Sequence, residues 1–214
     1  MNYLELVKSL SVEAGIGPGP STVIGQIGEY LRVKGWIDKA YEEIQGVHEN
    51  WNFLRKDATI SATPTITNPT DFGSWKRKSF RCYDTATGTD DEQFIEDVEW
   101  EIFRDSYLYG PARSQTGMPS TITVRPDNIL VTWPISDGSY TVTGEYYASP
   151  DVMVSDVDIP IFPMHHLAIV WKGLMLYARY SSEPDKYAID QYKPLLRKLE
   201  LSQLPKMSFG APLV

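Results

Sequence analysis

The sequence predicts an α+β fold: mainly a helical bundle of two N-terminal and two C-terminal helices, with an inserted small antiparallel β region and long loops. Two observations carry this prediction. Apolar residues recur every three or four positions at both ends of the chain, whereas the central part alternates polar with apolar residues and is rich in turn residues. With 214 residues, of which 42% are hydrophobic, the chain can also bury a substantial core.

No internal repeat or low-complexity linker divides the chain, so we expect a single unit with four parts. These parts are N-terminal helices in 1–56, a β-rich insertion with a short helix in 57–158, C-terminal helices in 159–203 and an extended tail in 204–214.

The first helix is predicted over residues 3–14, where apolar residues form one stripe. The glycine- and proline-rich residues 15–20 should end it. Ser21 or Thr22 is then expected to cap a second helix, whose helical period continues to Trp51.

Short alternating runs predict the strands of the central region, at about 59–63, 78–83, 120–124, 129–132 and 140–147. A short helix is expected over 98–104. Residues 125–128 and 136–139 have the composition of hairpin turns, which predicts an antiparallel meander for the last three strands.

The third main helix follows Pro163 and is apolar nearly all round. Such a helix must be covered on more than one face, either inside a bundle or by a neighbouring subunit. The four apolar residues away from its main stripe are therefore the predicted subunit interface: Ile169, Val170, Leu176 and Tyr177. The last helix should start at Ser181 or Ser182 and be kinked by Pro194.

Charge and cysteine content exclude several classes of protein. A formal net charge of −8 disfavours a protein that grips nucleic acid through its phosphates, but not one that surrounds DNA without gripping it. Cys82 is the single cysteine, so the chain has no internal disulfide or cysteine-based zinc site, and a reducing cytosol suits its folding. We expect a soluble protein without a secretory signal or membrane span.

The candidate reactive groups each favour a structural interpretation. Residues 15–20 lack the Gly-Lys-Ser/Thr ending of a phosphate loop, and the adjacent His165 and His166 are poorly spaced to share a metal ion. Two acidic groups match neither a calcium loop nor a catalytic pair of carboxylates: Asp151, Asp156 and Asp158, and Glu96, Glu99 and Glu101. We predict no catalytic residue, no metal site and no cofactor.

Aromatic residues in the β region could stack on a sugar: Trp75, Tyr107, Tyr109, Trp133, Tyr146 and Tyr147. Packing within the β region or at a subunit interface is the preferred interpretation, because tryptophan and tyrosine are enriched at interfaces.

The combined pattern resembles the head-to-tail adaptor proteins of tailed bacteriophages, also called connector or head-completion proteins. The resemblance covers most of the chain and lies in folding motifs: Tyr3-Leu4-Glu5-Leu6-Val7, Val12-Glu13-Ala14-Gly15-Ile16, Gly28-Glu29, Trp36-Ile37-Asp38-Lys39-Ala40-Tyr41-Glu42-Glu43-Ile44-Gln45, Trp51 with Phe53-Leu54-Arg55, Tyr146-Tyr147-Ala148-Ser149-Pro150 and Ile159-Pro160.

The resemblance implies a structural virion protein at the head–tail junction, folded and assembled in the host bacterial cytoplasm, and no enzyme. It implies a homo-oligomeric ring, commonly twelvefold, between the portal protein and the tail or nozzle proteins, with a channel through which DNA passes. In related connectors a C-terminal segment seats against the portal, which makes four apolar tail residues the predicted portal interface: Met207, Phe209, Leu213 and Val214.

Two alternatives stay open at this point. One is a carbohydrate-binding or host-recognition module that uses the aromatic residues of the β region, above all Trp75 and Trp133. The other is a hydrolase that uses the acidic residues of 96–101.

Overall fold

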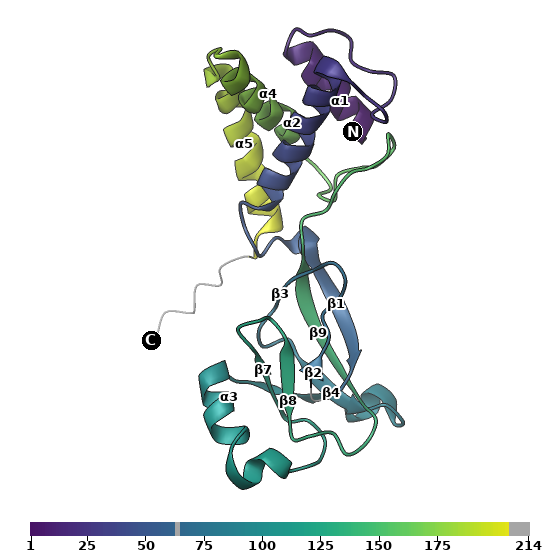
Figure 1. Ribbon diagram of the computed structural model, residues 1–214, viewed down its shortest axis with the longest axis vertical. Helices are drawn as coiled ribbons and strands as arrows, with labels where there is room; N and C mark the ends of the chain where they lie inside the picture. Colours follow the sequence, from purple (N-terminus) through teal and green to yellow (C-terminus); the bar gives the residue numbers. More distant parts are fainter. Residues whose placement is uncertain (63–64, 206–214) are drawn as a thin grey trace, which may run out of the picture. The chain divides into compact units, whose positions relative to one another are not determined.

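The computed structural model describes residues 1–62 and 65–205, which form two compact units. One unit contains Met1–Leu54 and the chain from Pro150 onward, and the other is Arg55–Ser149. The α+β prediction is confirmed: two N-terminal and two C-terminal helices pack together, and the part of the chain between them in sequence forms two small sheets (Figure 1). The sequence-based expectation that the whole chain functions as one unit stays a prediction.

The first unit is a helical bundle of α1 (Tyr3–Glu13), α2 (Gly28–Gln45), α4 (Leu167–Ser181) and α5 (Lys186–Gln203). Helix α4 packs against each of the other three helices, which explains why it is apolar nearly all round. Gly173 permits the closest approach, because a Cβ at this position would lie 2.9 Å from Leu10 Cδ2 of α1.

The start of α2 differs from the sequence prediction. The helix begins at Gly28, so a cap at Ser21 or Thr22 is wrong. The Thr22 hydroxyl accepts a hydrogen bond from the Ile24 amide, but within a turn. Gly25 adopts a φ of +68°, which the interior of a helix cannot contain, and Gly28, where α2 begins, still has a φ of +62°. Glycine thus extends the loop to residue 27.

The C-terminal helices also begin later than predicted. Helix α4 starts at Leu167, after His165 with a φ of +66°, and α5 starts at Lys186. Ser182 has a φ of +61° and ends α4 as its left-handed cap, so it cannot start the next helix. Pro194 lies within the continuous α5.

The second unit is built around β9 (Tyr140–Ala148), the longest strand. Its five-stranded sheet has the order β1 (Arg55–Ser61), β9, β4 (Arg81–Asp84) and β5 (Gln93–Phe94). The fifth strand, β3 (Phe72–Trp75), pairs with the C-terminal end of β9. The second sheet has the order β2 (Thr65–Ile66), β8 (Leu130–Trp133), β7 (Thr121–Val124) and β6 (Glu96–Asp97). Helix α3 (Trp100–Tyr107) packs beside β7.

The predicted meander is only half right. Residues 125–128 do form the antiparallel hairpin turn between β7 and β8, with the Asn128 amide donating to the Arg125 carbonyl at 2.9 Å. Residues 136–139 do not form a hairpin, because β9 leaves β8 and pairs with β1 and β4 in the other sheet. Alternation defines the two faces of a strand but leaves its partners open.

The core of this unit lies between the two sheets and receives side chains from both. Its members are buried and mostly apolar: Ala58, Ala62, Ile66, Trp75, Phe80, Cys82, Ile95, Ile122, Leu130, Val142, Tyr146 and Ala148. Gly144 makes room for the Phe80 ring, since a Cβ at this position would lie 2.5 Å from Phe80 Cδ1.

Candidate docking surfaces

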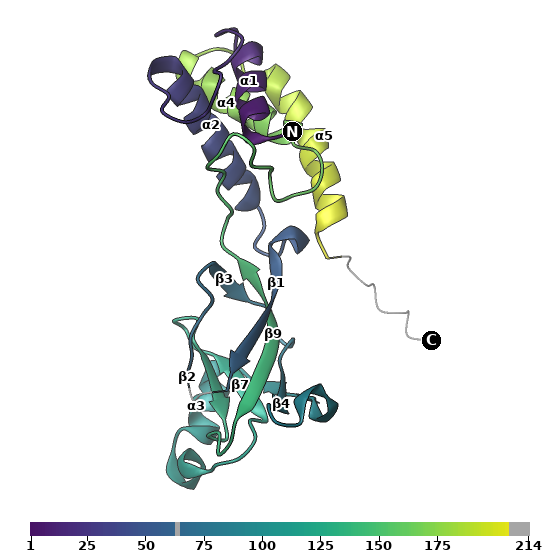
Figure 2. The same ribbon diagram turned by 90° about the vertical axis from the view of Figure 1, so that its right-hand side faces the viewer.

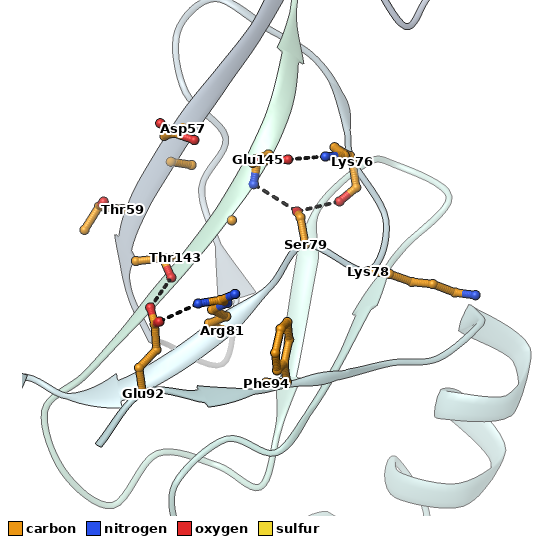
Figure 3. A pocket seen from close by; sticks show the side chains of 12 residues that line it. Asp57, Thr59, Lys76, Lys78, Ser79, Arg81, Glu92, Phe94, Thr143 and Glu145 are labelled. Atoms are coloured by element: carbon orange, nitrogen blue, oxygen red, sulfur yellow. Dashed lines mark hydrogen bonds and ion pairs between the residues drawn. The ribbon is translucent and has the colours of Figure 1, made fainter. Parts of the chain in front are cut away.

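The outer face of the five-stranded sheet is polar. The register places Asp57 opposite Glu145 and Thr59 opposite Thr143, and Arg81 of β4 lies on the other side of Thr143. Because directly opposed residues point to the same side of a sheet, these side chains form one face. They line an open cavity of about 460 Å³ (Figure 3).

Ion pairs hold the side chains of this groove in place. Glu145 is paired with both Arg55 and Lys76, and these hydrogen bonds, that from Arg55 foremost, hold the pKa of the Glu145 carboxyl below its ordinary value. At the other end, Arg81 donates to Glu92 at 2.8 Å, and its guanidinium lies 4.4 Å from the centre of the Phe94 ring.

The chemistry of the groove favours contact with a partner over catalysis. The described residues that line it include no histidine or cysteine. The hydroxyl of Ser79 donates to the Lys76 carbonyl at 2.7 Å and accepts the Glu145 amide at 2.9 Å, so no base activates it. Within residues 1–62 and 65–205, no group of three or more histidine, cysteine or acidic side chains could hold a metal ion.

A second surface lies on the helical unit, along residues 150–163, which we call the strap. Four of its aliphatic residues are largely exposed: Val152, Val154 and Val157 at 74% each and Ile159 at 65%. Two further aliphatic residues, Ile24 and Ile27, are exposed at 65% and 82% in the loop before α2. The Val23 amide donates to the Asp156 carboxylate at 2.6 Å, which holds this loop against the strap.

Hydrogen bonds to α1 and α2 fix the backbone of the strap. The Tyr41 hydroxyl joins its two ends, because it donates to the Asp151 carboxylate at 2.9 Å and accepts the Ile161 amide at 2.8 Å. Gln45 bonds both the amide and the carbonyl of Asp151, and the Tyr3 amide donates to the Asp158 carbonyl at 2.8 Å. The strap is thus an ordered segment with exposed apolar side chains, which is typical of an interaction surface.

The three aspartates considered as calcium ligands belong to this framework. Asp151 accepts from Tyr41, Asp156 from Val23, and Asp158 from the amides of Val154 and Ser155. Each carboxylate therefore serves a different backbone or side-chain donor instead of converging on one ion. The exposed aliphatic residues of this segment are not predicted from the sequence, although they stand among its aspartates there.

The structure separates the four residues of the predicted subunit interface. Ile169 and Val170 are fully buried by helices of the same chain. Leu176 and Tyr177 are partly exposed, and the Tyr177 ring lies edge-on to Trp36 at 5.3 Å. Only the latter pair is available to a neighbouring subunit. The predicted portal residues Met207, Phe209, Leu213 and Val214 lie outside the described residues.

The aromatic residues considered for sugar binding pack within the β unit. Trp75 and Tyr146 are each only 6% exposed. Trp133 stacks on Tyr107 at 4.3 Å, and its indole nitrogen donates to the Ala112 carbonyl. The preferred packing interpretation is thus confirmed for these four residues, and Trp75 in particular is too buried to stack on a sugar.

The comparisons with known proteins agree with a role in assembly. The family model described as SU10 adaptor protein, a family of phage head–tail adaptors, matches residues 1–209. No curated protein matches the chain. Over the part that the structure describes, no helix is long and apolar enough to cross a membrane.

Proposed function

Because the chain belongs to the SU10 adaptor protein family, a family of structural phage proteins, we propose that it forms a ring beneath the portal and joins the capsid to the tail. The observation that carries this proposal is the match of the family model over residues 1–209, which include both units. The ring would contain the chain in many copies, commonly twelve, and would contact the portal at one end and tail or nozzle proteins at the other.

Assembly needs no covalent step. A portal ring offers identical sites in a circle and raises the local concentration of bound adaptors, so that contacts between neighbours too weak in solution become sufficient on the template. A net charge of −8 suits a channel wall along which DNA slides without binding.

The apolar C-terminal tail would provide the portal contact, through Met207, Phe209, Leu213 and Val214. The test is co-sedimentation with a closed ring of the cognate portal protein. We expect the full chain to bind, and a chain that ends at Pro205 to lose binding while it retains its helical circular dichroism.

A matched variant separates apolar contact from tail length. Replacing the four apolar tail residues by serine should abolish binding, whereas Ser208→Gly in the same tail should not. Unchanged binding of the chain that ends at Pro205 would refute the assignment of the portal contact to the tail.

A further inference from the structure

Helix α5 has an exposed face whose chemistry complements the strap. Tyr187 and Leu201 are exposed at 61% and 66%, and with Pro194 they recur at intervals of seven on one stripe. The helix carries four basic residues against two acidic ones, and the basic side chains are all exposed: Lys186, Lys193, Arg197 and Lys198. Exposed Asp190 lies on the same stripe, three residues after Tyr187, so the stripe has an excess of basic side chains but is not purely basic. This surface, called the α5 face below, is apolar with a net positive charge.

The strap has the opposite charge. Residues 150–163 contain three aspartates and no lysine or arginine. The strap exposes four aliphatic residues among these aspartates, and the 21–27 loop, which the Val23–Asp156 hydrogen bond holds against it, exposes two more. Two straps facing each other would repel, whereas a strap facing an α5 face would combine apolar burial with attraction between opposite charges.

The two surfaces lie on different sides of the helical unit. The exposed aliphatic residues of the strap belong to a segment that is hydrogen-bonded to α1 and α2, whereas α5 packs on α4. Figure 1 shows the strap along one side of the bundle, near the N-terminus, and α5 on the other side; the rotated view in Figure 2 turns the strap toward the reader. One copy can therefore present its strap to one neighbour and its α5 face to another.

We propose that the strap of one copy docks on the α5 face of the next copy, in a head-to-tail contact. A contact between two different surfaces of the same chain is heterologous, and it closes into a ring when the rotation between copies divides a full turn. The fixed backbone of the strap favours such a contact, because little conformational entropy is lost on docking. This inference rests on the proposed ring and identifies the surfaces that would join its subunits.

Two variants of the full chain test the contact, since each disables one surface. The strap variant carries Val154→Lys and Val157→Lys, whose positive charges would face the basic α5 face of the next copy and repel it. The α5 variant carries Lys198→Glu and Leu201→Glu. All four positions are exposed, so both variants should keep the wild-type fold, which their amide spectra would show.

The decisive measurement mixes the two variants. Each variant alone should stay monomeric at millimolar concentration, because every contact needs both surfaces. Mixed, they can form one intact contact, between the strap of the α5 variant and the α5 face of the strap variant. Amide shifts of ¹⁵N-labelled α5 variant should therefore move along residues 150–163 when unlabelled strap variant is added, and added salt should weaken the effect.

Val12→Lys is the matched control, because Val12 is an exposed valine of α1 outside both surfaces. It should self-associate like the wild type. Two results would overturn the proposal: a mixture without shift changes at millimolar concentration, or a strap variant that self-associates like the wild type. Neither result involves the portal, so a chain that fails this test but binds portal rings keeps the proposed adaptor function and loses only this interface.

Discussion

Gly144→Ala tests the packing of the β unit at its tightest point. The added Cβ would lie 2.5 Å from Phe80 Cδ1, and Phe80 is only 1% exposed. To restore an ordinary carbon–carbon contact the ring must move by about 1 Å inside a close-packed core. Overpacking of this kind costs about 1–3 kcal/mol. Alanine recovers about 0.5–1 kcal/mol because it loses less backbone entropy than glycine, so we expect a net destabilisation of about 0.5–2 kcal/mol.

The assay must separate the two units, because one global transition cannot be assumed for them. Hydrogen exchange read by mass spectrometry in a urea series does this. Peptides of β1 and β9 should lose protection at lower urea in Gly144→Ala, while peptides of α2 should not change. Gly35→Ala is the matched control, since a Cβ there meets nothing within 4 Å and alanine favours the helix.

Phe80→Leu tests whether the Phe80 ring causes the loss of stability in Gly144→Ala. If the clash with the ring is the cause, the double variant Gly144→Ala/Phe80→Leu should lose less stability than the sum of the single variants, by at least about 0.5 kcal/mol. Unchanged or raised stability of β1 and β9 in Gly144→Ala would show that the core has room for a Cβ beside Phe80.

Four further predictions concern ionisable or hydrogen-bonded side chains of the two units. Burial lowers the pKa of His166, so the neutral ring stabilises the fold above the ordinary histidine pKa and this stability is lost as the pH falls; His166→Gln should flatten that loss in acid-unfolding curves of the helical unit. The pKa of Glu145 is lowered by its hydrogen bonds, so Glu145→Gln should cost about 0.5–2 kcal/mol near neutral pH and nothing once acid protonates the carboxyl, as measured by urea unfolding. Burial raises the pKa of Cys82 to about 11, so thiol reagents should label it only as fast as the β unit opens, which kinetics in increasing urea would show. Gln45→Leu removes both side-chain hydrogen bonds to Asp151 and should cost about 1–3 kcal/mol, with faster hydrogen exchange confined to the strap; exchange as slow as in the wild type would contradict the assigned role of Gln45.

Local signals predicted the fold best where neighbours in sequence are neighbours in space. Helix α1 agrees with its stripe because Asn2 and Glu5 form a complete capping box, and the β7–β8 hairpin agrees because a four-residue turn specifies it. The partners of β9 could not be predicted, because β1 is some eighty residues distant and the alternating pattern fits several pairings equally well.

The candidate surfaces depended even more on tertiary structure. The sequence shows that Val152 and Val154 are apolar, but only the hydrogen bonds of Tyr41 and Gln45 leave them outside the core on a fixed backbone. Conversely, Ile169 and Val170 were assigned to a subunit interface because α4 needs cover, which α1, α2 and α5 of the same chain provide. Helical periodicity shows that α4 must be buried, but it does not show whether helices of the same chain or a neighbouring subunit bury it.

The proposed function requires that this chain forms a ring between portal and tail. The most direct measurement is negative-stain imaging with mass photometry of the chain, alone and mixed with closed rings of the cognate portal protein. We expect an added ring at one end of the portal, with a mass that gives the copy number. Closed portal rings that take up no adaptor would contradict the proposed function.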